Sequence, residues 1–289
     1  MAFRLFLRLR LGLGLGLGLG LTLATGCISG ERLATNLGPV PVPGHVHVHI
    51  LADDGSVRVT TADIAQVELQ VVSSGYDLPR DLDLSMTPHG DQVDIVATTR
   101  WHLHLFDLTR RSLHLEVRAP RDADVEINSG DGSVEVDAIT GRLDIQTGDG
   151  DVAVRGARGI IRLHTGDGSI DGGDLDGSID ASTGDGSVHL AGRFDALAVH
   201  TGDGKVVASA WPGSRMMQPW RLQTGDGNVK LGLPHDLGAR IDASTDDGRV
   251  RSTIPLQQLE DSRIEGDING GGPPIVVRTG DGSIELRQI

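Results

Sequence analysis

Apolar and polar residues alternate through the middle of the chain, and the alternation repeats at a fixed interval. Alternation of period two is typical of short strands that bury one face. Corresponding apolar positions lie nine residues apart, with no run of helical periodicity between them. These positions are Leu143, Val152, Ile161, Ile170, Ile179, Val188, Leu197 and Val206. The pattern therefore predicts a series of strands of about five residues, each bounded by a corner.

A four-residue motif, Thr-Gly-Asp-Gly, occupies every second corner. It begins at Thr147, Thr165, Thr183 and Thr201, and a close copy begins at Ser129, so that the motif recurs every 18 residues. Glycine supplies the positive φ that such corners are expected to need, and aspartate tolerates the left-handed region better than most residues. A fixed period of roughly 20 residues indicates stacked supersecondary units, here two strands and two corners each.

A two-strand unit cannot bury its apolar face alone, so the units must pack on one another. Two packings fit the repeat: consecutive antiparallel hairpins, or stacked coils of a β-solenoid with parallel strands. Equal spacing and corners of similar length favour the solenoid, in which like residues form one inward row that rises about 4.8 Å per coil. The predicted fold is all-β, a single-stranded β-helix-like stack of 18-residue coils with an irregular N-terminal β cap.

The strand pattern is less regular on either side of the equal repeats. We expect residues 45–125 to form an irregular β region that caps the open end of the solenoid repeats at 126–289. The later corners are spaced by 23, 21 and 34 residues and begin at Thr224, Thr245 and Thr279. Because extra residues in a repeat array form loops at its rim, we expect rim insertions at 209–222 and 252–275.

Residues 1–26 have the features of a secretory signal peptide, with three arginines before a short apolar run. The small residues that end at Gly26 and precede Cys27 resemble the lipobox of bacterial lipoproteins. This resemblance implies cleavage before Cys27 and the attachment of lipid, palmitate included, at that residue. Two alternatives are an ordinary signal peptide with an incidental cysteine and a glycine-patterned membrane helix.

Residues 27–44 have no core-forming pattern and are predicted to be a lipid-anchored tether. Cys27 is the only cysteine, so no internal disulfide supports the fold. Cleavage after Gly26 removes three arginines and no acid, which leaves 23 basic against 40 acidic residues and a net charge of −17. This charge argues against nucleic acid or an anionic lipid surface as a partner, and it is compatible with divalent cations or basic partners.

The corner aspartates form a first candidate site. In stacked coils their carboxylates would lie about 4.8 Å apart, and each adjacent pair would repel by roughly 0.9 kcal/mol in bulk water. Hydrogen bonds to corner N–H groups and threonine hydroxyls would relieve this repulsion, and so would a ladder of Ca²⁺ ions, although the nine-residue Ca²⁺-binding repeat is absent. The row consists of Asp131, Asp149, Asp167, Asp185 and Asp203, continued by Asp226, Asp247 and Asp281.

Alternating histidines form a second candidate site. An HxH pair with a third histidine can hold Zn²⁺. Histidines that simply face solvent on a half-exposed strand give the same pattern, so the sequence alone assigns no metal ligand. The residues are His45, His47 and His49 on one strand, His102 and His104 on a second, and His114, expected on a neighbouring strand.

The insertion that starts at Ala210 contains two of the three tryptophans, Trp211 and Trp220. An exposed tryptophan pair on a rim loop could contact sugar rings or a partner protein. The alternative is a loop that folds back over a sheet edge as a local cap.

Catalytic signatures are absent from the sequence. It contains no GxSxG, HExxH or GxxxxGK[ST] motif. Glycan cleavage needs one particular pair of carboxylates, or a carboxylate-bound cation beside a base, whereas the acids here repeat uniformly. The chain is therefore predicted not to be an enzyme and to need no cofactor, with Ca²⁺ as the one open alternative.

Three stretches carry a family resemblance: the repeated TGDGSV corners, LPHDLGARIDASTDDGRV at 233–250 and GDINGGGPPIVVRTGDGSIEL at 266–286. They resemble the bacterial putative-adhesin family of β-strand-repeat proteins, domain of unknown function 4097, over about residues 45–289. The resemblance implies a β-solenoid at the bacterial envelope and brings no catalytic residues.

These observations favour a non-catalytic lipoprotein, anchored through Cys27 to a membrane outside the cytoplasm, that acts as an adhesin or interaction scaffold. Its expected partner is a protein or glycan surface, and not nucleic acid. Two alternatives are a calcium-binding structural repeat module and a β-helix carbohydrate-active enzyme.

Overall fold

The computed structural model describes residues 32–76, 80–100 and 111–289. The regular structure of this part of the chain is entirely β, with 23 strands. Across these described ranges, no helix is long and apolar enough to cross a membrane. The predicted signal peptide and Cys27 lie outside the described residues.

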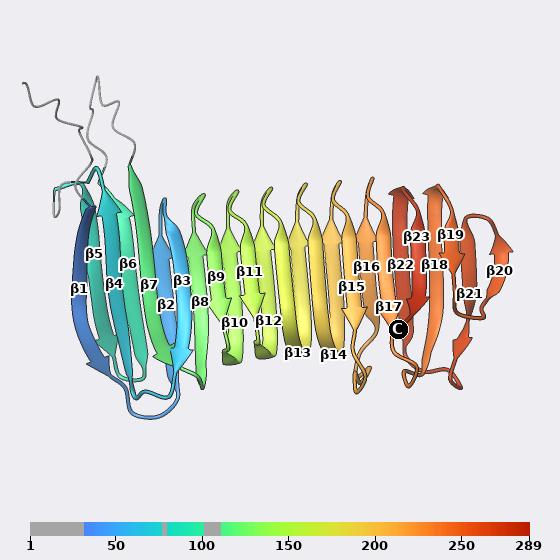
Figure 1. Cartoon of the computed structure of the whole chain (residues 1–289), viewed down its shortest axis with the longest axis horizontal. Helices are drawn as coiled ribbons and strands as arrows, with labels where there is room; N and C mark the ends of the chain where they lie inside the picture. Colours follow the sequence, from blue (N-terminus) through green and yellow to red (C-terminus); the bar gives the residue numbers. More distant parts are fainter. Residues whose placement is uncertain (1–31, 77–79, 101–110) are drawn as a thin grey trace, which may run out of the picture. The chain divides into compact units, whose positions relative to one another are not determined.

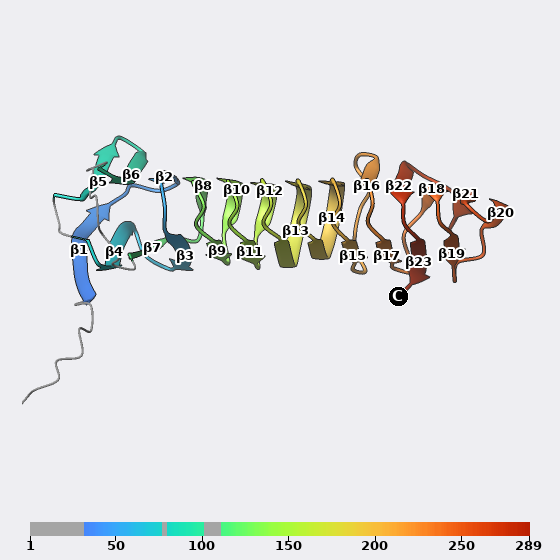
Figure 2. The same ribbon diagram turned by 90° about the horizontal axis from the view of Figure 1, so that it is seen from above.

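Most strands stack in two facing rows along one axis, as Figure 1 shows from the side and Figure 2 from above. Each coil contributes one strand to each row, and the strands within a row are parallel. In spatial order the first row contains β6 (Gln92–Thr99), β2 (Val46–Ala52), β8 (Ala123–Ser129), β10 (Thr140–Thr147), β12 (Arg158–Thr165), the second halves of β13 (Ile170–Thr183) and β14 (Val188–Thr201), β16 (Trp220–Thr224), β22 (Pro274–Asp281) and β18 (Ala239–Asp247).

The second row faces the first and is built in the same way. In spatial order it contains β7 (Ser112–Pro120), β3 (Ser56–Ala62), β9 (Val134–Asp137), β11 (Val152–Arg155), the first halves of β13 and β14, β15 (Val206–Ala210), β17 (Val229–Leu233), β23 (Ile284–Gln288) and β19 (Val250–Ser252). Antiparallel strands extend the rows at the two ends of the stack. They are β1 (Arg32–Pro41), β4 (Gln66–Ser74), β5 (Leu82–His89), β20 (Gln257–Glu260) and β21 (Arg263–Ile268).

The strand register confirms the solenoid. Leu143 pairs with Ile161, and Ile161 pairs with Ile179, each step being one 18-residue coil. All the apolar positions predicted between 143 and 206 are at most 2% exposed, so like residues share one interior row. Parallel pairing at this offset excludes the alternative of consecutive antiparallel hairpins.

The C-terminal coil departs from the order of the sequence. β22 and β23 lie between β16/β17 and β18/β19, so that the corner of Thr279 is placed between those of Thr224 and Thr245. The segment 252–275, predicted as a rim insertion, instead contains β20 and β21, and β21 pairs antiparallel with β18 beyond the last coil. After β17 the chain passes over one coil position and forms β18 and β19 in the next one. It then forms β20 and β21 at the end of the stack and returns, so that β22 and β23 fill the position passed over.

The N-terminal strands depart from sequence order in the same way. The coil formed by β2 and β3 lies between β6/β7 and β8/β9. β4 pairs antiparallel with β7, and β5 pairs antiparallel with β6. The region 45–125, predicted as an irregular cap, therefore contributes parallel strands to the stack as well as strands that extend its end.

Part of the tether predicted at 27–44 is instead strand β1, Arg32–Pro41. It pairs antiparallel with β4, and Leu37 and Val40 pack against the core. The register shifts between these two residues, where Pro39 lies. Proline is compatible with such a position because an edge strand leaves one row of its N–H groups outside the ladder.

Candidate functional site

The TGDG corners are held together by their threonine hydroxyls. Thr165 Oγ1 donates to the carbonyl oxygens of Gly148 and Gly150 in the preceding coil, at 3.2 and 2.9 Å, and accepts the N–H of Gly168 at 3.2 Å. The same buried donor recurs at Thr147, Thr183, Thr201, Thr224, Thr279 and Thr245. These hydroxyls therefore bind glycine carbonyls, and not the corner aspartates as the sequence predicts.

The motif glycines permit a close approach between successive corners. A Cβ atom at Gly168 would lie 2.1 Å from the carbonyl oxygen of Gly150, and one at Gly166 would lie 2.6 Å from that of Gly148. None of these four residues has a positive φ, so the prediction that they supply one is wrong. Positive φ occurs in the opposite corner, as at Gly156 with φ 67°.

The corner aspartates lie exposed along one edge of the stack, from Asp131 to Asp281. Within the described ranges, one group of three metal-ligating side chains gathers with its ligand atoms within 4.8 Å of one another, and it contains no corner aspartate. Because the threonine hydroxyl forms hydrogen bonds with the glycine carbonyl and N–H groups, the corner does not require a cation to close. The Ca²⁺ ladder stays an untested alternative.

The predicted histidine site is divided between the two rows. His114 lies on β7 in the second row, beside Ser56 of β3, and so it is not on a strand next to His47 and His49 of β2 in the first row. His102 and His104 lie outside the described residues.

The group of three is formed by His45, His47 and Asp124. His45 directly precedes β2 and His47 lies on it, both exposed, and the neighbouring strand β8 provides Asp124, which pairs with His47 in the register. His45 Nε2 lies 3.3 Å from Asp124 Oδ1, and His47 Nδ1 lies 3.3 Å from Asp124 Oδ2. On its other side, His45 Nδ1 lies 3.0 Å from Asp122 Oδ1. The two imidazole rings meet edge-on, with centroids 5.4 Å apart.

The charges of this group shift the pKa values of its members. Burial lowers the pKa of His45, but hydrogen bonds and charge from Asp122 and Asp124 outweigh it and raise the pKa above 6.5. Burial raises the pKa of Asp124, but a hydrogen bond from the Arg142 N–H, at 2.7 Å, and the nearby imidazoles bring it below 3.8. Both shifts favour an ion pair between His45 and Asp124.

A second histidine–carboxylate pair lies on the opposite side of β2. His49 Nδ1 lies 3.5 Å from Asp94 Oδ1, and His89 Nε2 lies 3.6 Å from Asp94 Oδ2. These distances are longer than those around Asp124.

Sequence reasoning misses Asp124 of this group and Asp122, which lies beside His45. Asp122 lies 77 residues after His45. The alternation of histidines is visible in the sequence, but their partners follow only from the position of β2 beside β8, which departs from sequence order.

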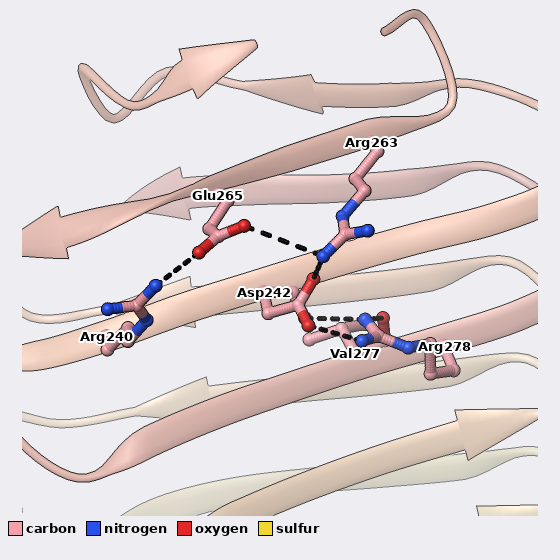
Figure 3. Close-up of polar contacts among 6 residues, drawn as sticks. All are labelled: Arg240, Asp242, Arg263, Glu265, Val277 and Arg278. Atoms are coloured by element: carbon pink, nitrogen blue, oxygen red, sulfur yellow. Dashed lines mark hydrogen bonds and ion pairs between the residues drawn. The ribbon is translucent and has the colours of Figure 1, made fainter. Parts of the chain in front are cut away.

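A chain of charged side chains crosses the C-terminal coils on the first row (Figure 3). Arg278 of β22 binds Asp242 of β18, and Arg263 of β21 lies 3.4 Å from Asp242 and 3.5 Å from Glu265. Arg240 completes the chain by pairing with Glu265. Each pair is partly exposed and contributes little alone, but the alternating signs span three strands and favour the observed placement of β22 beside β18.

The predicted insertion at 209–222 contains a loop at 211–219 between β15 and β16, and it does not present a tryptophan pair. Trp220 is fully buried and packs edge-on against Phe194, with ring centroids 5.9 Å apart. Of the two possibilities that the sequence leaves open, the exposed tryptophan pair is therefore ruled out by the burial of Trp220. Trp211 and Met217 do reach solvent, with 39% and 76% of their surface exposed.

A shallow groove of about 310 Å³ lies where the end of this insertion meets the outer surface of the first row. Its floor crosses β12, β13, β14 and β16, and it combines apolar side chains with both signs of charge. The residues that define it are Ile160, Arg162, Asp180, Ala198, Pro219 and Arg221.

The family model Toastrack DUF4097 matches residues 45–287. The chain is also similar to solved structures, at low sequence identity. One is a putative lipid binding protein from Parabacteroides distasonis, with 12% identity, coverage of 90% of this chain and 98% of that chain, and a TM-score of 0.49. Another is a putative adhesin from Bacteroides fragilis, with 9% identity, coverage of 89% and 97%, and a TM-score of 0.42. No curated protein matches this chain.

Proposed function

Since the chain belongs to the Toastrack DUF4097 family, we propose that it is a non-catalytic, lipid-anchored scaffold of the bacterial envelope that holds a protein or glycan partner. The single observation that carries the proposal is the repeated threonine ladder, in which every TGDG corner is fixed by buried bonds to the coil before it. Such a body keeps its outer surfaces in fixed positions, which is useful for display and gives little scope for an induced catalytic fit.

The surface that best suits a partner is the groove beside the insertion. Ile160 is 48% exposed although it is large and apolar, and Arg162 and Asp180 lie next to it. Apolar surface flanked by both charges is the composition that interaction surfaces use for affinity and orientation. Met217, on the same insertion, adds a second exposed apolar side chain.

Membrane attachment is proposed through lipid on Cys27, with a tether limited to the residues before β1. A Cys27→Ser variant expressed in the native host should lose incorporation of labelled fatty acid and leave the membrane fraction. Retention of both label and membrane association by this variant would remove the anchor from the proposal and leave the binding role to be judged separately.

The binding role is tested with purified full-length protein on whole bacterial and host cells and on a glycan array. An Ile160→Asp substitution should reduce binding at least tenfold without changing the melting temperature, because the side chain is already half exposed. Leu259→Asp is the matched control, since Leu259 is 46% exposed on β20 and lies outside the groove. Absence of binding to every surface, or equal loss in both variants, would contradict the proposal.

A further inference from the structure

We infer that His45, His47 and Asp124 form a binding site for a divalent transition metal of the zinc class. This inference concerns a different part of the molecule from the groove and does not depend on the scaffold role. The three side chains are the one group in the described ranges whose potential ligand atoms all lie within 4.8 Å of one another. Two imidazoles and one carboxylate are a donor set that zinc accepts in proteins.

The two nitrogen–oxygen separations at the site match those between neighbouring ligands of a tetrahedral zinc ion. Zinc–nitrogen and zinc–oxygen bonds of about 2.0–2.1 Å place neighbouring ligand atoms of a tetrahedron roughly 3.3 Å apart. His45 Nε2 lies 3.3 Å from Asp124 Oδ1, and His47 Nδ1 lies 3.3 Å from Asp124 Oδ2, so each nitrogen has this separation from one of the two carboxylate oxygens. The imidazoles are 41% and 50% exposed, so the remaining coordination position would face solvent and take water.

The groups around the site prepare it for a cation. Asp122 Oδ1 lies 3.0 Å from His45 Nδ1, so it can accept the Nδ1–H and leave Nε2 as the free nitrogen. This carboxylate–histidine arrangement is the usual support of a metal-bound imidazole. Asp124 Oδ1 accepts the N–H of Arg142, which fixes the carboxylate and leaves Oδ2 toward His47.

The alternative is a set of ordinary histidine–carboxylate ion pairs without a metal, and the molecule supplies a matched comparison. His89 also pairs with a carboxylate, Asp94, at 3.6 Å, and His49 approaches the same group at 3.5 Å. This second cluster does not bring three ligand atoms within the same limit. His89→Gln therefore removes a similar exposed ion pair without touching the inferred site.

The test is calorimetric titration of ZnCl₂ into the full-length protein at neutral pH, in a Cys27→Ser background that removes the thiol as a competing ligand. We expect one Zn²⁺ per chain. His47→Ala and Asp124→Asn should each weaken binding at least tenfold, and Asp122→Asn should weaken it by about 10–100-fold, because Asp122 orients the His45 ring. His89→Gln should bind as the parent does, and all variants should keep the parent's circular dichroism spectrum.

A second measurement locates the metal. Zn²⁺ should shift the imidazole NMR signals of His45 and His47 and leave that of His89 in place. The inference is overturned by an absence of binding heat, by unchanged affinity in His47→Ala and Asp124→Asn, or by loss of binding in a His102→Gln/His104→Gln variant alone. Each of these results would mean that the cluster is an ion-pair network and not a metal site.

Discussion

Thr279 Oγ1 donates hydrogen bonds to the carbonyl oxygens of Gly225 and Gly227, at 3.3 and 2.8 Å, although 52 residues separate Thr279 from Gly227. Thr245 in turn donates to the carbonyls of Gly280 and Gly282, which follow it in the sequence. The corner ladder thus continues without interruption through a coil that the chain inserts last. The C-terminal strands β22 and β23 therefore form an internal coil of the stack and not its last coil.

Deletion of residues 274–289 should disturb coils on both sides of the missing one. β16/β17 and β18/β19 would each lose a parallel partner, so their amide hydrogens should lose protection together. Hydrogen exchange measured by mass spectrometry over 220–268 would show this. A deletion of residues 212–215 removes no strand and is the control. Loss of protection confined to 239–268 in the first variant would contradict the inserted order.

Thr165→Val tests one step of the ladder. The substitution keeps the side-chain shape but removes the hydroxyl that serves the carbonyls of Gly148 and Gly150. Leaving buried backbone groups without this donor should lower the free energy of unfolding by about 1–3 kcal/mol. Thr140→Val, at an exposed strand position, should change it by less than about 0.5 kcal/mol. Denaturant titration of both variants distinguishes the two positions, and equal effects would show that the hydroxyl has no special role.

Gly168→Ala tests the close approach of successive corners. The added Cβ would lie 2.1 Å from the carbonyl oxygen of Gly150, so that two coils must move apart. We expect a loss of about 3 kcal/mol or more in the free energy of unfolding. Gly173→Ala is the matched control, because its Cβ would meet no atom within 4 Å. A Gly168→Ala variant with the stability of this control would mean that the corners are not packed this closely.

The regular middle of the molecule follows from its sequence because each coil there stacks on the one before it. Leu143, Ile161 and Ile179 share an interior row for this reason, and equal spacing is enough to predict it. The two ends could not be predicted, because an 18-residue period does not show which coil is filled last. For the same reason the sequence does not predict that Asp124 lies beside His47. The two residues are neighbours only because β2 is placed beside β8. The burial of Trp220 could not be predicted either, because the uneven interval before it gives no register for β16.

Glu285 should make the inserted coil sensitive to acid. Its side chain accepts a hydrogen bond from Arg287 at 2.6 Å, and this bond has the largest effect on the pKa of Glu285, which it lowers. Burial raises the pKa, whereas Lys230 at 3.2 Å lowers it further. The pKa of Glu285 therefore falls below 4.5. A lowered carboxyl pKa stabilises the fold above the ordinary value, and this contribution is lost as the pH falls through the folded-state pKa. Because these groups are partly exposed, Glu285→Gln should lower the melting temperature by only about 1–3 °C at neutral pH.

The difference between Glu285→Gln and the parent should shrink as the pH is lowered from 4.5. Glu260→Gln, at an exposed position on β20, serves as the control for loss of one negative charge. Melting curves recorded across this range check the sign, and a difference that grows toward acid would contradict it.

Calcium should leave the stability of the protein almost unchanged. The corner carbonyl oxygens accept hydrogen bonds from threonine hydroxyls and glycine N–H groups of adjacent coils, as from Thr165 and Gly166. The corner is therefore closed without a cation. A site held at about 100 times its Kd would add about 2.7 kcal/mol, or roughly 5–10 °C in melting temperature. We expect a difference below about 1 °C between calcium and chelator.

The decisive comparison adds Asp167→Asn/Asp185→Asn to the same melting experiment. If the corner aspartates only shape the surface, replacing two adjacent ones removes like-charge repulsion and should raise the melting temperature slightly, with or without calcium. A calcium ladder predicts the reverse: a calcium-dependent rise of several degrees in the parent, which the double substitution abolishes. Because both substitutions lie at exposed positions outside the threonine ladder, such a result could not be attributed to a damaged fold, and the aspartate edge would then be a cation site.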